Sequence, residues 1–112
     1  MTYAPDCGDI VWIDLSPQAG HELRGRQAAL VLTPLAFSVA TGLALIVPMT
    51  TKAKGSPFEV PMRGARQAKG VVLAHELRTV DYMARNTQKF DTCPPPVLEE
   101  VRAIAEALVR PE

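Results

Sequence analysis

The chain has little of what several classes of protein require. Its 112 residues include two cysteines and two histidines, and every apolar run ends far short of the ~18 residues of a membrane span. Cys7 and Cys93 fit no metal-ligand spacing, and two histidines do not complete a set of ligands. We therefore expect no metal, no cofactor and no membrane segment. The N-terminus has neither a basic nor an apolar stretch for export, so we expect a cytoplasmic protein with free thiols.

The composition is that of one globular domain spanning residues 1–112. Apolar residues make up 47% of the chain and the mean hydropathy is +0.06, which excludes a disordered protein. The net charge is zero, but it is unevenly distributed. Residues 21–89 contain ten Lys or Arg and four Asp or Glu, whereas the two ends together contain two and eight. This distribution indicates either a basic surface suited to an anionic polymer or scattered, solvated charge.

One stretch combines polar side chains with a predicted sheet edge. Residues 20–27 contain two glycines, a histidine, an acid and two arginines, and they lead directly into the apolar run 28–32. Polar groups held beside a rigid strand are typical of binding and catalytic sites. The stretch is therefore either a functional loop or an ordinary solvated hairpin loop.

Apolar runs bounded by Pro and Gly predict five or six short strands. They cover residues 10–15, 29–32, 43–47, 58–62, 71–74 and 77–81. Run 29–32 is apolar on both faces and is expected to be central in its sheet, whereas Pro48 is expected to end the third strand and Pro61 confines the fourth to an edge or bulge. Trp12 is interpreted as a core aromatic rather than an exposed stacking platform. Residues 63–69 form a basic loop closed by Gly70.

The last segment has helical periodicity. Val97, Val101, Ile104 and Leu108 form one apolar stripe, Pro94–Pro96 suit the first turn, and Arg110-Pro111 ends the helix. The predicted fold is mainly β, of the α+β class: a small, strongly bent barrel or sandwich covered by a C-terminal amphipathic helix.

Several motifs together resemble the MazF/PemK family of toxin–antitoxin endoribonucleases. The matching segments are 8–12, 17, 20–22, 29–34, 47–52, 54–55, 57–60, 70–74, 78–81 and 84–85. The resemblance covers nearly the whole chain. It implies an SH3-like barrel of five to seven strands, a homodimer, metal-independent cleavage of single-stranded RNA, and a cognate antitoxin with a disordered tail.

Metal-independent cleavage is chemically reasonable because the 2′-hydroxyl of RNA can attack the neighbouring phosphate. The products are a 2′,3′-cyclic phosphate and a 5′-hydroxyl. The protein must then accept one proton, donate another, and surround the phosphate with cations or N–H groups.

The resemblance assigns catalytic roles to residues at two strand ends. Thr50 matches the family's threonine after Val-Pro-x, and Glu22 matches its supporting loop acid. Where the family usually has Arg-Pro-Ala, this chain has Gln27-Ala28-Ala29, and a neutral amide does not replace a guanidinium. Arg26 precedes Gln27 and is the candidate to supply the missing charge, although a shift of one residue along a strand changes the face.

Further residues are candidates for RNA contacts or, alternatively, ordinary surface charge. They are Arg24, Thr51, Lys52, Lys54, His75, Glu76, Arg78 and Arg85. His75 and Glu76 replace a different pair that borders the RNA groove in the family. Two other functions stay open: a catalytically impaired relative that binds RNA or antitoxin, and a gyrase poison with the same barrel. The Val-Pro-x-Thr-Thr pattern favours the ribonuclease over the gyrase poison.

Overall fold

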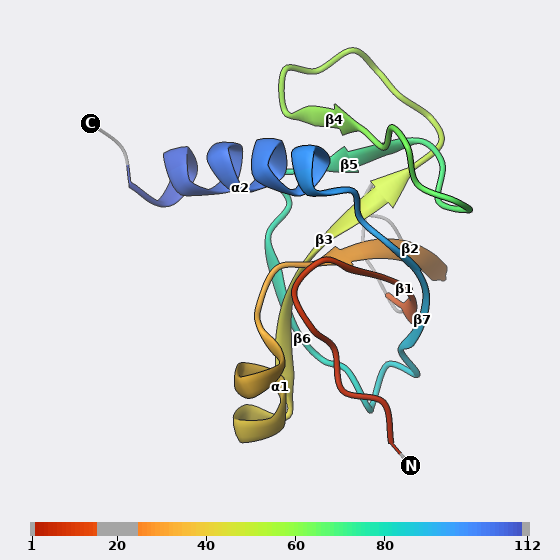
Figure 1. Cartoon of the computed structure of the whole chain (residues 1–112), viewed down its shortest axis with the longest axis vertical. Coiled ribbons are helices and arrows are strands. Elements are labelled where there is room, and N and C mark those ends of the chain that lie inside the picture. Colours follow the sequence, from red (N-terminus) through yellow and green to blue (C-terminus); the bar gives the residue numbers. More distant parts are fainter. Residues whose placement is uncertain (1, 16–24, 111–112) are drawn as a thin grey trace.

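The computed structural model describes residues 2–15 and 25–110 (Figure 1). Glu22 and Arg24 lie outside the described residues. The elements in chain order are β1 (Asp9–Asp14), β2 (Arg26–Val31), α1 (Leu35–Thr41), β3 (Leu43–Thr50), β4 (Glu59–Pro61), β5 (Val71–Leu73), β6 (Arg78–Asp81), β7 (Gln88–Thr92) and α2 (Pro95–Val109). All six strands predicted from the sequence are present, and the α+β fold with a C-terminal helix is confirmed.

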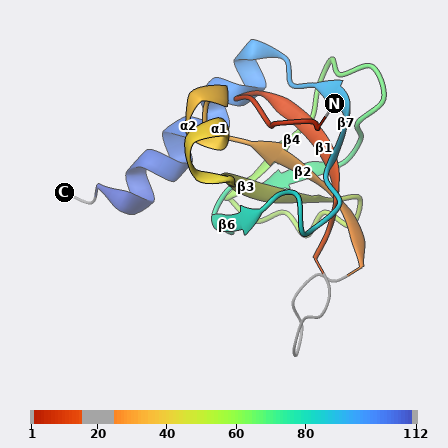
Figure 2. The ribbon, with the colours of Figure 1, turned by 90° about the horizontal axis from the view of Figure 1, so that it is seen from below.

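β3 lies at the centre of one seven-stranded antiparallel sheet. One edge of β3 pairs with β2, and the path continues through β1 to β7. The other edge pairs first with β6 and then with β5, which in turn pairs with β4. Figure 2 shows this arrangement from below, with β6 beside β3. Within residues 2–15 and 25–110, the path ends at β4 and β7, so the described strands do not close into a hydrogen-bonded barrel.

Parts of the first three strands are buried on both faces. On one face, Ile10, Leu30 and Val47 join a core that includes Val97 and Val101 of α2. On the other face, a second core contains Val11, Ile13, Leu15, Ala29, Val31, Ala44, Ile46, Val80 and Tyr82. The predicted central position of the second strand is therefore confirmed. Burial on both faces explains its continuous apolar sequence.

The helix α2 follows the predicted boundaries but buries only its first half. Pro95 occupies its first turn and Arg110 its C-terminal end. Val97 and Val101 are buried, whereas Leu108 is 45% exposed, so the predicted apolar stripe covers the sheet only with its first half. Figures 1 and 2 show the reason: the C-terminal end of α2 extends beyond the sheet.

Pro48 does not end the third strand as expected, because β3 continues to Thr50. On one edge of β3, pairing with β6 stops at Ile46 and pairing with β5 starts at Met49. Pro48 lies between these two partners, where its missing N–H interrupts neither ladder on that edge.

Two elements were not predicted. The helix α1 has no polar face: Leu35, Phe37 and Val39 are all exposed. The strand β7 has the sequence Gln-Lys-Phe-Asp-Thr, whose polar residues suit an edge strand but give no hydrophobic period.

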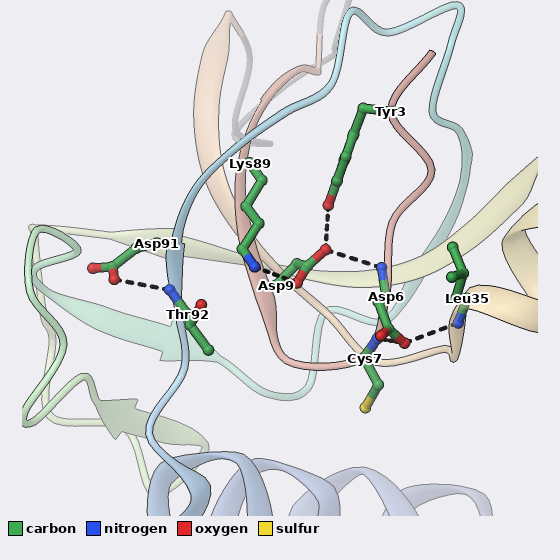
Figure 3. Close-up of polar contacts among 8 residues, drawn as sticks. All are labelled: Tyr3, Asp6, Cys7, Asp9, Leu35, Lys89, Asp91 and Thr92. Carbon is green, nitrogen blue, oxygen red and sulfur yellow. Dashed lines mark hydrogen bonds and ion pairs between the residues drawn. The ribbon is translucent and has the colours of Figure 1, made fainter. Parts of the chain in front are cut away.

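Two aspartates attach the N-terminal segment to the sheet (Figure 3). The Asp9 carboxylate accepts hydrogen bonds from the Tyr3 hydroxyl (2.5 Å) and the Asp6 N–H (3.0 Å), and it pairs with the Lys89 ammonium at 3.2 Å. Asp6 accepts a hydrogen bond from the N–H of Leu35, the first residue of α1. These contacts join the starts of β1 and α1 to β7. Burial beside Asp9 raises the pKa of Tyr3 well above its usual range.

Both cysteines are free thiols, as expected. Burial raises the pKa of Cys93 to about 11, so this thiol is un-ionised at neutral pH. In the described part of the chain, no helix is long and apolar enough to cross a membrane.

Asp91 of β7 holds the basic loop 63–69 against the sheet. Its buried carboxylate accepts hydrogen bonds from the N–H groups of Gln67 (2.6 Å), Ala68 (2.8 Å) and Thr92 (2.8 Å), the last visible in Figure 3. Burial alone would raise the pKa of Asp91, but these backbone N–H groups hold it below the ordinary value. The loop is therefore fixed by an ionised carboxylate.

We expect Asp91→Asn to lower the free energy of unfolding by about 1–3 kcal/mol at neutral pH, because an amide presents only one acceptor oxygen to these donors. The folded pKa lies below the unfolded one. The stabilisation is therefore complete above the unfolded pKa near ~4 and is lost as the pH falls through the folded pKa. Urea unfolding of both chains at several pH values measures this difference, which should shrink in acid.

Glu99→Gln is the matched control. Glu99 is an exposed carboxylate on α2 that pairs with Arg102, and its loss should cost less than about 0.5 kcal/mol. Equal losses for the two variants, or a difference that does not change with pH, would contradict the role given to Asp91.

Candidate nucleic-acid interface

A groove of about 410 Å³ lies where β2 begins and β3 ends. Its described lining consists of Trp12, Arg26, Gln27, Ala28, Met49, Thr50, Thr51, Lys52, Gln67, Ala68, Lys69 and Phe90. Five of these were predicted as site residues: Arg26, Gln27, Thr50, Thr51 and Lys52. The fold thus brings together two segments that are about twenty residues apart in sequence.

Strand register explains how Gln27 and Thr50 meet. In the β2–β3 ladder, Ala29 pairs with Pro48, and the strands are antiparallel. This pair is the last one of the ladder. Continued by two residues, the register would bring Gln27 level with Thr50, and residues level with each other share a face of the sheet. Both residues line the groove that begins beyond the last pair.

Arg26 is directed away from Gln27. It is the first residue of β2 and pairs in register with Asp14 of β1. Its guanidinium donates a hydrogen bond to the Asp14 carboxylate at 2.8 Å and another to the Gln88 side-chain oxygen at 3.2 Å. Arg26 lines one end of the groove, but supplying charge beside Thr50 would require it to leave these partners.

The end of β3 is held by its own backbone and by Gly70. The Lys52 N–H donates a hydrogen bond to the Thr50 hydroxyl oxygen at 3.1 Å, which leaves the hydroxyl proton available for another acceptor. Gly70 has a φ of +97°, and a Cβ at this position would overlap the carbonyl oxygen of Thr50 and stand 3.1 Å from the Thr51 Cα. Only glycine allows this close approach.

The loop after β3 is ordered by Glu59. Its carboxylate accepts hydrogen bonds from the N–H groups of Lys54 and Gly55 at 3.0–3.1 Å. This contact fixes the backbone between Lys52 and β4. Lys52 consequently has a defined position at the groove, although its side chain is exposed.

The rest of the described lining was not predicted as part of the site. It consists of Gln67, Ala68 and Lys69 from the basic loop, together with Trp12, Phe90, Ala28 and Met49. The concentration of basic residues in 63–69 is the sequence feature that could have indicated that this loop lines the groove. No sequence feature indicated Phe90, because its strand was not predicted.

Trp12 and Phe90 form a stacked pair. Their ring centroids are 4.4 Å apart and the rings are inclined by 15°. The pairing of β1 with β7 shifts between Ile10 and Val11, leaving Phe90 as the extra residue of a bulge. Bulges commonly redirect a side chain, here toward Trp12. Trp12 is 40% exposed, so its interpretation as a core residue is wrong. The core on this face of β1 ends at Ile10, one pleat before Trp12.

The other predicted residues lie outside this groove. Arg85 lines a neighbouring groove of about 590 Å³ and donates a hydrogen bond to the carbonyl of Asp14. Arg78 begins β6 opposite Ile46. His75 packs at a tilt against Phe58 and lies 3.6 Å from the Glu76 carboxylate. Lys54 contributes its backbone N–H to Glu59.

The groove is suited to an anion. Among its described lining residues, Arg26, Lys52 and Lys69 are basic and none is acidic. The charge of Arg26 is matched by Asp14, whereas no ion pair within residues 2–15 and 25–110 engages Lys52 or Lys69. Within the same ranges, no three His, Cys, Asp or Glu side chains are grouped to hold a metal ion. The donors available here are hydroxyls, amides and ammonium groups.

Comparison with known proteins gives matches over nearly the whole chain. Residues 6–109 match the model of the PemK-like, MazF-like toxin of type II toxin–antitoxin systems. The endoribonuclease toxin MazF of Escherichia coli K12 is 38% identical over 107 residues, which are 96% of each protein. The endoribonuclease PemK of Escherichia coli is 35% identical over 98 residues, covering 84% of this chain and 74% of that protein.

Solved structures agree with the sequence matches. MazF of Deinococcus radiodurans (Form-I) superimposes with a TM-score of 0.91 and 44% identity, over 96% of this chain and 98% of that one. A MazE-MazF structure (Form-II) from the same organism gives a TM-score of 0.88 and 42% identity, over 99% and 100% of the two chains.

We expect Gly70→Ala to destabilise the chain by several kcal/mol, roughly 2–4, because the new methyl group meets backbone atoms of Thr50 and Thr51 that are fixed in the sheet. Gly55→Ala is the matched control, since Gly55 also has a positive φ (+81°) but open space around it. It should cost only the ~1–2 kcal/mol of the backbone conformation. Chemical unfolding measures both, and equal losses would show that no steric conflict exists at Thr50.

Proposed function

Since the chain belongs to the PemK-like, MazF-like toxin family of type II toxin–antitoxin systems, we propose that it is a sequence-specific endoribonuclease acting on single-stranded RNA. The observation that supports this most directly is the composition of the groove. A hydroxyl, an amide and two ammonium groups, which no described carboxylate pairs with, line one space whose described lining contains no carboxylate. A phosphate with a second negative charge developing on it needs this environment.

The reaction we propose needs no metal. The 2′-oxygen of one nucleotide attacks the adjacent phosphorus as its proton is removed, and the bond to the 5′-oxygen breaks as that oxygen receives a proton. The products are a 2′,3′-cyclic phosphate and a 5′-hydroxyl. The Thr50 hydroxyl would donate to a phosphate oxygen, since its own oxygen accepts from Lys52. Glu22, which precedes β2 in the sequence, would assist removal of the 2′-hydroxyl proton.

The positive charge at the phosphate comes from Lys52 and Lys69 in this proposal. The candidate role of Arg26 as a replacement for the family's arginine would require its guanidinium to exchange Asp14 and Gln88 for the phosphate. Gln27 would contribute a neutral amide beside Thr50. Thr51, Arg24, Lys54, His75, Glu76, Arg78 and Arg85 remain proposed RNA contacts along the strand on either side.

We further propose that the chain forms a homodimer, is inhibited by a cognate antitoxin with a disordered tail, and acts in the cytoplasm on messenger RNA. The MazE-MazF structures of Deinococcus radiodurans support the antitoxin partner. Exposed apolar side chains of α1 are available for dimer contacts: Leu35, Phe37 and Val39. The alternative of a catalytically impaired member gains no support from relatives named endoribonucleases.

Analysis of RNA ends tests the proposed reaction. Purified protein incubated with a long unstructured RNA in excess chelator should give discrete fragments with 2′,3′-cyclic phosphate and 5′-hydroxyl ends, at an unchanged rate. Thr50→Ala should lose most of this activity while remaining folded. Cleavage that stops in chelator and returns with a divalent ion would contradict the reaction, as would 5′-phosphate products.

Gln27→Arg should raise the cleavage rate. We expect a guanidinium at this position to lie level with Thr50, as the β2–β3 register continued by two residues implies, and one charge-stabilising donor is typically worth about 10²–10³ in rate. Ala28→Pro added to it should increase the rate further by restricting the start of β2 to an extended backbone. Single-turnover kinetics give these rates.

Arg26→Ala distinguishes whether Arg26 or the pair Lys52 and Lys69 supplies the positive charge at the phosphate. If the two lysines supply this charge, Arg26→Ala leaves the cleavage rate within about tenfold of wild type. Abolished cleavage at unchanged RNA affinity would instead assign the charge to Arg26. No gain from Gln27→Arg would show that this position does not reach the scissile phosphate.

A further inference from the structure

Trp12 is the only tryptophan in the chain, and its large ring is partly exposed on a strand whose neighbouring residues are fully buried. Ile10, two residues earlier on the same face, has no exposed surface. A tryptophan at 40% exposure gives up part of the burial free energy that the adjacent core could provide. Its position at the margin of the core is therefore a feature to explain.

Phe90 keeps this ring in a fixed orientation. The bulge in β7 turns Phe90 onto Trp12, and the two rings lie nearly parallel at 4.4 Å. One face of the indole is thereby occupied, while both rings still line the groove. A rigid, partly exposed aromatic pair is pre-organised to extend its stack by one more planar group.

The surroundings indicate what that planar group is. Lys52, Lys69 and the exposed side chain of Gln67 line the same groove, and no acidic side chain is among its described lining. Ammonium groups contact phosphates, and an amide can both donate to and accept from the edge of a base. Aromatic side chains beside a basic groove are the usual means of holding single-stranded nucleic acid. A purely apolar peptide would leave these polar groups without partners.

We propose that the Trp12–Phe90 pair is a stacking platform for one base of single-stranded RNA, next to the nucleotide whose phosphate lies at Thr50. This inference rests on the proposed function and adds a base-binding subsite to it. The platform orients the RNA by stacking, and Gln67 contacts the edge of the stacked base. Trp12 is thus a positioning residue, separate from the groups that act on the phosphate.

Binding to an uncleavable RNA tests the platform. The probe is a strand of about ten nucleotides spanning a mapped cleavage site, with fluorine replacing each 2′-hydroxyl so that internal attack is impossible. Its binding should change the fluorescence of Trp12 saturably. Trp12→Ala should bind about 5- to 150-fold more weakly, the range expected for the loss of one stacked base, and Trp12→Phe only a few-fold more weakly. Leu108→Ala, which removes an apolar side chain of similar exposure (45%) on α2, should bind like wild type.

Removing the bases one at a time identifies the stacked one. In wild type, an abasic substitution at one position should cost the same factor as Trp12→Ala and abolish the fluorescence change. In Trp12→Ala, the same abasic strand should bind no more weakly than the complete strand, because the contact is already absent. Wild-type fluorescence alone gives the answer if Trp12→Ala fails to fold.

Three results would overturn the platform. The first is unchanged RNA affinity in folded Trp12→Ala, and the second is an abasic penalty that is the same in both chains. The third is weakened binding of an antitoxin peptide with unchanged RNA binding, which would assign the rings to a protein interface. These results leave the proposed function intact if the wild type still cleaves RNA. A wild-type chain that neither binds nor cleaves RNA overturns the proposed function itself.

Discussion

The backbone pairing of β3 is the constraint on which the rest of the structure depends. This strand bonds to β2 on one edge and to β6 and β5 in succession on the other. The change of partner around Pro48 lets the strand continue to Thr50, where the sheet ends and the groove begins. Without that continuation, the Thr50 hydroxyl would not lie beside the start of β2.

Acidic side chains explain why a chain of zero net charge has a basic groove. Asp14, Glu59 and Asp91 each accept hydrogen bonds from groups that frame the groove: the Arg26 guanidinium, the backbone of the loop after β3, and the backbone of the basic loop. None of these three carboxylates belongs to the described lining of the groove. The carboxylates thus stabilise the segments around the groove, whereas Lys52 and Lys69 line the groove itself.

The fold could be predicted largely because local pattern and burial agree. Val11, Ile13 and Leu15 alternate and are all buried, and Pro61 lies on an edge strand. Predictions were wrong where the burial of a residue depends on segments that are distant in sequence. Trp12 has the sequence context of a core residue, but the core ends one pleat earlier. Predicted site residues at the ends of β2 and β3 line one groove because the family motifs lie at these strand ends. The prediction did not include Gln67, Lys69 or Phe90. The Asp91 carboxylate positions the loop that contains Gln67 and Lys69, and a bulge in β7 positions Phe90; neither contact can be read from a local sequence pattern.

Free strand edges are where separate chains can pair into aggregates. In the described part of the chain, the path of the sheet ends at the edge strands β4 and β7. β4 is three residues long and includes Pro61, which offers no N–H to an incoming strand. β7 contains Lys89 and is interrupted by the bulge at Phe90. The irregularity that turns an aromatic ring toward the groove therefore also makes this edge a poor template for another copy of the chain, so one local distortion protects the protein from aggregation while shaping its surface.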